Sequence, residues 1–356
     1  MRKIHIAILM FALSLFLIPT TGDSCTSFCL DKDRPIVGKN YDWSIENGLV
    51  IINKRGVQKT AFQYRGKEYG SPVKWKSKFG SITFNQFGRE MPMGGINEAG
   101  LVVEVLMLTY SVYPEPDSRP TISVLQWVQY QLDNFSTTKE VIESDSQVRI
   151  LQTFSGPGIH YLICDKEGNS AAIEFLDGKL ICHKGDEMPV QVLTNSTYAE
   201  GMRSWHKADP PHTYVRARRF VRTAELLERY GAEKSGDPVE YAFDVLARVS
   251  QGSFTKWSIV YDIQALTIYF RTFSNPKIRR IDLRNFGFSC NSPVLILAID
   301  SLISGDVSER FTEYSREDNR LLAENIFRSI SLDEKDREAV LRMAVVYPEE
   351  NNCVND

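Results

Sequence analysis

Residues 25–43 read CTSFCLDKDRPIVGKNYDW, and this stretch has the pattern of a β-hairpin. Two largely apolar segments, Cys25–Leu30 and Pro35–Trp43, flank the polar turn Asp31–Arg34. Short apolar runs separated by turn-favouring residues predict a pair of antiparallel strands. We therefore expect the folded part of the chain to begin at Cys25 with this hairpin.

The segment before Cys25 has the pattern of a secretory signal peptide. After a basic start, Ile4–Ile18 is almost continuously apolar, and Pro19–Ser24 is polar and small. Gly22 and Ser24 are the small residues at positions −3 and −1 of a cut before Cys25. The apolar run is shorter than the roughly 20 residues that span a bilayer. We expect residues 1–24 to be removed from an exported protein, periplasmic or secreted, without a membrane span.

Two other fates of this segment remain open at the level of sequence. One is an uncleaved anchor, and the other is lipoprotein processing, since a cysteine follows the signal. Lipoprotein signals normally carry leucine at −3 and small residues at −2 and −1, whereas this chain has Gly22 and Asp23. The distinction matters because an acylated α-amine cannot act as a base.

Cleavage before Cys25 would place a thiol and a free α-amine on the same residue. The reference pKa of an α-amine is near 8, so a useful fraction is unprotonated at neutral pH. Such an amine can take the thiol proton, as in N-terminal nucleophile enzymes. The alternative for a cysteine at this position is a disulfide or a buried, inert thiol.

Further along the chain, apolar segments and turns predict more antiparallel strands. Asp177-Gly178 and the run Lys166–Asn169 are turn signals that tolerate positive φ. The predicted strands are Ile159–Cys164, Ser170–Leu176, Lys179–His183, Trp257–Asp262 and Leu266–Arg271.

Amphipathic segments predict helices between and after these strands. The first, Ile122–Leu132, precedes Lys139–Glu143, which Ser136 or Thr137 would cap. The others are Val215–Tyr230 (ending at Gly231), Ser315–Ile330, and Ser331–Val346, which has a capping-box pattern and stops at Pro348. Antiparallel strands with interleaved helices predict an α+β fold in which helices cover sheet faces.

Composition excludes several classes of protein. The 356-residue chain has a formal net charge of −3 and no basic block, which argues against a nucleic-acid partner. Its five histidines are scattered, and no Cys or His cluster has the spacing of metal ligands. We therefore expect neither a metal nor a cofactor.

Five segments in order resemble one known family. Cys25-Thr-Ser-Phe with Gly38-Lys-Asn-Tyr-Asp-Trp43 is similar to the start of the choloylglycine hydrolases, also called linear amide C–N hydrolases. This family includes bile salt hydrolases and penicillin V acylases. The other four segments are Gly94–Leu101, His160–Glu174, Val192–Ser196 and Arg219–Arg222.

The resemblance implies a fold and a domain organisation. It implies an αββα four-layer sandwich of the N-terminal nucleophile hydrolase type over residues 25–285. The remaining residues, 286–356, would form a helical C-terminal extension that packs on this domain or mediates contacts in a homo-oligomer. Cys290 and Cys353 are candidates for a disulfide that would tether the end of this extension in an oxidising compartment.

The same resemblance implies catalytic roles. Cys25 would be the nucleophile and its own base, and Asp42 would hold the α-amine. Asn195 would donate to the oxyanion, where one such donor is typically worth ~3–4 kcal/mol. Arg219 would orient the site. Lys39 stands where well-known members carry arginine, so a cation is kept but its bidentate geometry is lost.

The substrate pocket departs further from the family pattern. Met107 aligns with an asparagine of bile salt hydrolases and an aromatic residue of several penicillin acylases. Its backbone N–H would still serve the oxyanion, whereas its side chain makes the wall flexible and apolar. We predict that Trp43, Met107, Leu108 and Tyr110 line a pocket for an acyl group.

These expectations define a reaction and its rivals. The expected reaction is hydrolysis of a small-molecule N-acyl amide through an acyl-thioester on Cys25. Candidate substrates are penicillin V, an acyl-homoserine lactone, a fatty acyl amide and a conjugated bile acid. The alternatives are acyl transfer from the same thioester, or an inactive exported or lipid-anchored binding protein of the same fold.

Overall fold

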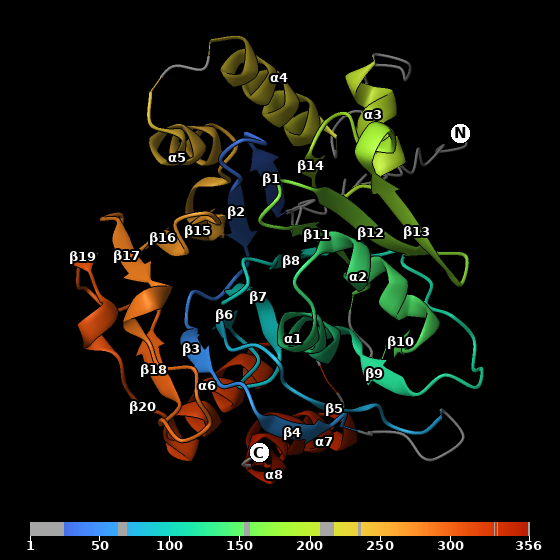
Figure 1. Cartoon of the computed structure of the whole chain (residues 1–356), viewed down its shortest axis with the longest axis vertical. Helices are drawn as coiled ribbons and strands as arrows, with labels where there is room; N and C mark the ends of the chain where they lie inside the picture. Colours follow the sequence, from blue (N-terminus) through green and yellow to red (C-terminus); the bar gives the residue numbers. More distant parts are fainter. Residues whose placement is uncertain are drawn as a thin grey trace, which may run out of the picture.

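Two β-sheets stacked face to face form the centre of the protein, and helices cover the outer face of each (Figure 1). The computed structural model describes residues 25–62, 70–152, 157–206, 217–233, 236–330, 332 and 334–354. This four-layer α+β arrangement is the αββα sandwich expected of an N-terminal nucleophile hydrolase.

The seven-stranded sheet contains the hairpin that begins the described chain. Its first two strands pair antiparallel with Thr26 opposite Asn40, and the turn between them lies at Asp31–Arg34. A Cβ at Gly38 would overlap the ring of Phe28, so glycine is required where the two strands approach. In spatial order the sheet consists of β14 (Val192–Leu193), β1 (Thr26–Leu30), β2 (Ile36–Asp42), β15 (Thr255–Asp262), β16 (Thr267–Thr272), β17 (Arg279–Asp282) and β19 (Gly305–Asp306).

The nine-stranded sheet faces the first across the core. Apolar residues of both sheets, such as Phe28 and Val37 from one and Ile82 and Leu106 from the other, form one buried cluster. In spatial order its strands are β13 (Lys179–Lys184), β12 (Ser170–Leu176), β11 (Ile159–Cys164), β8 (Val102–Met107), β7 (Pro92–Asn97), β6 (Ser81–Asn85), β3 (Leu49–Asn53), β18 (Leu295–Ala298) and β20 (Thr312–Glu313).

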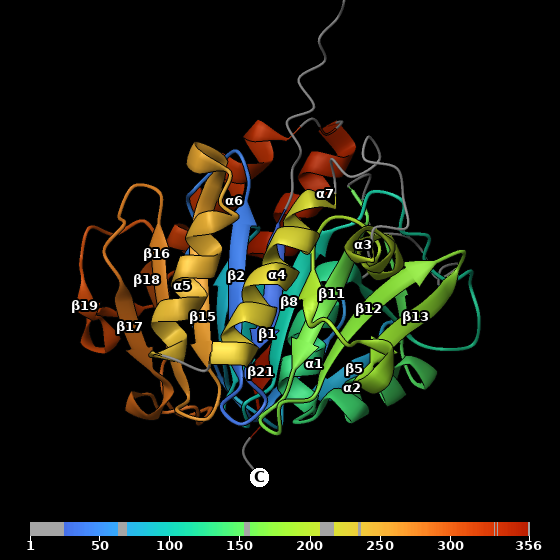
Figure 2. The same ribbon diagram turned by 90° about the horizontal axis from the view of Figure 1, so that it is seen from above.

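Helices form the two outer layers. On the seven-stranded sheet lie α4 (Arg218–Glu233) and α5 (Pro238–Arg248), with α3 (Tyr198–Trp205) beside them (Figure 2). On the nine-stranded sheet lies α1 (Val124–Asn134), followed by the short α2 (Thr138–Glu143). Among the helices of the described residues, none combines the length and apolarity needed to cross a bilayer.

Most predicted strands are confirmed within one or two residues. The predicted strand Ser170–Leu176 is observed with the same bounds, and Lys179–His183 is one residue longer. The strands between Leu49 and Met107 and helix α5 were not predicted. Asp237 caps α5, and Pro238 occupies its first turn, which is a sequence signal for a helix start.

Two predicted helix boundaries are wrong. The first helix begins at Val124 rather than Ile122, because Thr121–Ser123 forms β9 and pairs with β10 (Arg149–Leu151). Helix α4 continues through Gly231 to Glu233, since Gly231 does not adopt the positive φ that ends a helix. The predicted residues 215 and 216 lie outside the described residues.

The prediction of a helical extension after residue 285 is incomplete, because strand β18 pairs with β3 within the main sheet. Three helices follow: α6 (Arg316–Ser329), α7 (Glu334–Val345) and α8 (Tyr347–Glu350). Helix α7 ends at Val345, within one residue of the predicted end at Val346, and Pro348 lies in the first turn of the separate helix α8, where proline is tolerated. Ser331, the proposed cap of α7, lies outside the described residues.

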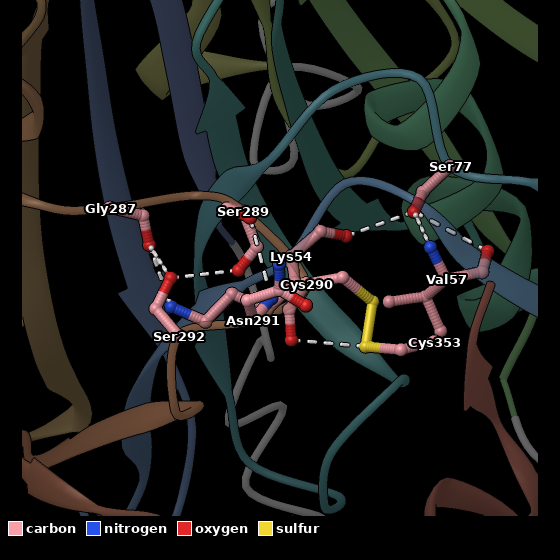
Figure 3. The surroundings of a disulfide bond; sticks show 9 residues. All are labelled: Lys54, Val57, Ser77, Gly287, Ser289, Cys290, Asn291, Ser292 and Cys353. Atoms are coloured by element: carbon pink, nitrogen blue, oxygen red, sulfur yellow. Dashed lines mark hydrogen bonds between the residues drawn. A yellow bond between two sulfur atoms is a disulfide. The ribbon is translucent and has the colours of Figure 1, made fainter. Parts of the chain in front are cut away.

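The predicted disulfide between Cys290 and Cys353 is confirmed (Figure 3). Their Cα atoms are 5.6 Å apart, and 63 residues separate them in sequence. Cys353 belongs to β21 (Asn352–Cys353), which pairs with β4 (Val57–Thr60) in a small sheet that also contains β5 (Lys74–Lys76). The end of the chain is therefore fastened to the body by a covalent bond and by a strand pair.

Candidate active site

Cys25 lies directly before β1, which runs between β2 and β14, and the residue is only 6% exposed. Burial raises the pKa of its thiol above the ordinary value, while the charges of Lys39 and Arg219 lower it. A thiol with a raised pKa is a weak nucleophile until a base removes its proton. Activation of this thiol would therefore require a base next to the sulfur atom.

The carboxylate of Asp42, at the end of β2, is held by three donors. Thr255 Oγ1 donates to Oδ1 at 2.5 Å, and Gln251 Nε2 donates to Oδ2 at 2.8 Å. Arg219 Nη1 lies 3.3 Å from Oδ2. Burial raises the pKa of Asp42, and the three donors lower it because they stabilise the charged form. A hydrogen bond from the Asp42 backbone to Cys25 connects this network to the thiol.

Arg219 reaches this network from the first turn of α4. Its side chain is 16% exposed, and burial lowers the pKa of the guanidinium while Asp42 and Cys25 raise it. An arginine retains its charge at such a position. The structure therefore brings together three of the predicted catalytic residues, Cys25, Asp42 and Arg219.

Lys39 points into the space between the two sheets. Its Nζ donates to the backbone carbonyl of Val105 and lies 3.7 Å from Glu104 Oε2. Tyr261 donates a hydrogen bond of 2.5 Å to Glu104 Oε1. Burial raises the pKa of Glu104 to about 7, and Lys39 opposes this increase. The predicted cation is thus buried near Cys25 and has a carboxylate partner that the sequence analysis did not identify.

Asn195, two residues after β14, contacts Met107 at the end of β8. Asn195 Nδ2 donates to the backbone oxygen of Met107 at 2.8 Å. Leu108 N donates to the carbonyl of Gly158, the residue directly before β11. Because N–H groups alternate in direction along a strand, the N–H of Met107 points away from β11, as does its carbonyl. The second amide proton of Asn195 and the N–H of Met107 are therefore on the same side of β8.

A buried carboxylate supports the loop that carries Asn195. Glu174 Oε1, on β12, accepts the backbone N–H of Tyr198 at 2.9 Å and lies 3.0 Å from His160 Nδ1. Tyr198 is the first residue of α3, and Thr197 caps this helix. These contacts hold the start of α3 immediately after Asn195.

A cavity of about 190 Å³ opens at the three polar groups of Cys25, Asp42 and Asn195. Its walls are otherwise almost entirely apolar. Asp42 is the only charged side chain among the described residues that line it. The apolar lining comprises Tyr41, Trp43, Phe87, Met91, Met93, Val105, Met107, Val124, Leu125, Pro157, Ile159, Phe327, Ile330, Leu332, Val340 and Met343.

Two of the four predicted pocket residues, Trp43 and Met107, line this cavity, and two do not. Leu108, the residue directly after β8, is fully buried and is not among the residues that line the cavity. Tyr110 is 38% exposed and hydrogen-bonds to Glu200 at the start of α3. The lining residues from the β6–β7 region and from α6 and α7 were not predicted from the sequence.

No cluster of metal-binding side chains was found in the part of the chain that the structure describes. The site consists of a buried thiol, a fixed carboxylate, a guanidinium and amide donors beside an apolar cavity. Such groups can activate a thiol and stabilise an oxyanion during acyl transfer.

Comparison with known proteins relates this geometry to one family. The family model for linear amide C–N hydrolases of the choloylglycine hydrolase family matches residues 25–209. The penicillin V acylase of Pectobacterium atrosepticum is 29% identical over 318 residues, covering 75% of this chain and 82% of that protein.

Solved structures have the same fold. The penicillin V acylase of Agrobacterium tumefaciens superposes with a TM-score of 0.68 at 26% identity, covering 82% of this chain and 98% of that one. A mutant conjugated bile acid hydrolase from Clostridium perfringens superposes with a TM-score of 0.64 at 20% identity, covering 79% and 98%.

Proposed function

The chain belongs to the linear amide C–N hydrolases of the choloylglycine hydrolase family, and from this premise we propose that it is an exported amidase whose mature form begins with Cys25. Its substrates are small N-acyl amides with an apolar acyl group. The observation that carries this proposal is that Cys25, Asp42 and Asn195 together line one apolar cavity.

In the proposed reaction the free α-amine of Cys25 takes the proton of its own thiol. The thiolate attacks the amide carbon, and the oxygen becomes negatively charged. The side-chain amide of Asn195 and the N–H of Met107 donate to this oxygen, because both lie on the same side of β8. Asp42, held by Arg219, Gln251 and Thr255, fixes the protonated amine.

The intermediate then collapses and breaks the C–N bond. The protonated amine gives its proton to the leaving nitrogen, and an acyl-thioester remains on Cys25. The amine, neutral again, activates a water molecule that attacks the thioester carbon. Release of the carboxylic acid restores the thiol, so that protons and bonds balance over the cycle.

Two features support export and cleavage before Cys25. Residues 1–24 have the order of a secretory signal. The disulfide between Cys290 and Cys353 is of the kind that persists in oxidising compartments. Cleavage would also generate the base that the buried thiol requires.

We expect the mature protein to begin at Cys25 with an unmodified amine. The reason is that every step above uses this amine, and the small residues Gly22 and Ser24 fit a signal-peptidase site. Intact-mass measurement of protein secreted by a bacterial host tests this expectation. A diacylglyceryl or N-acyl adduct, or a retained leader, would contradict it.

We also expect flexible or flat acyl groups to be preferred over a steroid. Four methionines, Met91, Met93, Met107 and Met343, line the cavity and can adapt to such groups. The test measures kcat/KM for penicillin V, fatty acyl-homoserine lactones and taurocholate. A kcat/KM for taurocholate that is at least tenfold higher than the others would contradict this preference. If none of these substrates is hydrolysed, the proposed function is contradicted.

A further inference from the structure

One wall of the cavity is built by the C-terminal helices. Phe327 and Ile330 come from the end of α6, and Val340 and Met343 come from α7. These residues are more than 100 positions beyond Asn195 in the sequence and lie outside the segment, 25–209, that the family model matches. In Figure 2, α6 and α7 (red) lie beyond the end of β2.

The cavity connects two separate apolar clusters. Cys25 and Tyr41 belong to the core between the sheets. Phe327, Val340 and Met343 belong to a second cluster under the C-terminal helices, together with Met91. A ligand attached to the thiol therefore reaches the second cluster by extending along the cavity.

Hydrogen bonds fix helices α6 and α7 to each other and to the segment around Arg89. Asn319 of α6 is fully buried, and its Nδ2 donates to the carbonyl of Ala344 on α7 at 2.6 Å. Its Oδ1 accepts the backbone N–H of Arg89 at 2.8 Å. The segment around Arg89 also supplies Phe87 and Met91 to the cavity. One asparagine thus ties both helices to a loop that forms another part of the wall.

The covalent anchor lies just beyond these helices. The disulfide from Cys353 to Cys290 and the pairing of β21 with β4 hold the chain after α8 (Figure 3). Both ends of the α6–α7 pair are therefore attached, since α6 follows strand β20 of the main sheet. A wall held in this way has a defined position before any ligand binds.

We propose that the α6–α7 pair sets the length of the acyl chain that this enzyme accepts. This inference rests on the proposed function, because it assigns the cavity to the acyl group on Cys25. The chain lies along the methionine-rich walls, and its methyl end meets Phe327, Val340 and Met343. Each methylene that fits contributes roughly fourfold to kcat/KM, until the chain reaches the helices.

Two substitutions with opposite expected effects test whether the α6–α7 pair limits the length of the acyl chain. Val340→Phe fills the cavity beside α7, and Met343→Ala enlarges it. With acyl-homoserine lactones from butanoyl to hexadecanoyl, Val340→Phe should move the optimum to shorter chains. Two methylenes that no longer fit would lower the ratio of long-chain to short-chain kcat/KM by roughly 15-fold. Met343→Ala should move the optimum to longer chains.

Glu338→Phe is the matched control, because it adds the same ring to the exposed face of α7 and should leave the length profile unchanged. Calorimetric titration of Cys25→Ala with the corresponding free fatty acids measures how affinity depends on chain length, independently of turnover. Unchanged profiles in both Val340→Phe and Met343→Ala would overturn the inference while the proposed function stands. An absence of hydrolysis with shifted binding profiles would overturn the proposed function alone.

Discussion

Replacing Cys25 by alanine is expected to lower turnover of every accepted N-acyl amide below detection, by roughly 10⁴-fold or more. The alanine variant keeps the α-amine and the oxyanion donors but has no atom that can form the acyl-thioester. Cys25→Ser should retain only a trace of activity, because a hydroxyl is much harder to deprotonate than a thiol. The measurement is kcat/KM with the best substrate of the acyl series.

Cys182→Ala is the control for this substitution. Cys182 is a free, half-buried thiol on β13, and burial raises its pKa to about 11, so it is not an activated nucleophile. The control should keep wild-type activity. Turnover by Cys25→Ala at the wild-type rate would show that the nucleophile is another residue.

Asn195→Ala is expected to lower kcat by ~10²–10³ with a smaller effect on KM. Asn195 Nδ2 already donates one proton to the carbonyl of Met107, so the amide is oriented before substrate binds. The contact with the substrate oxygen strengthens only as negative charge develops, which places its effect in kcat. Steady-state kinetics with a saturating substrate series separates the two constants.

Ser196→Ala serves as the matched control in the same loop. Ser196 is buried beside Asn195, and its hydroxyl lies 3.3 Å from Thr194 Oγ1. If loop packing were the important feature, this variant would lose as much activity as Asn195→Ala. A change in Asn195→Ala that is confined to KM would mean that the side chain binds substrate without stabilising the oxyanion.

Local pattern was enough to predict the hairpin and its polar residues. Strand residues alternate in direction, and a four-residue polar turn sets the register, so neighbours within a hairpin follow from the sequence. The same alternation argues against placing Met107 and Leu108 in one pocket, and the structure separates them. Tyr110 lies beyond β8, where strand alternation no longer applies.

Partners from distant segments were not predictable in the same way. Thr255 faces Asp42 only because β15 pairs with β2, and Gln251 precedes that strand. Glu104 meets Lys39 only because the two sheets stack with these residues on their inner faces. Each contact joins residues more than 60 positions apart, so it depends on sheet order and layer packing rather than on local propensity.

By itself the sequence determined the α+β class, the hairpin that starts at Cys25, and the residue types that carry the chemistry. These features depend on short-range alternation, turn chemistry and the order of motifs. Only the tertiary structure decided how Asp42 is held, which carboxylate accompanies Lys39, and that residues of α6 and α7 line the apolar cavity. A cavity is the space left where several elements fail to fill their shared interior, so it exists only once all of them are packed together.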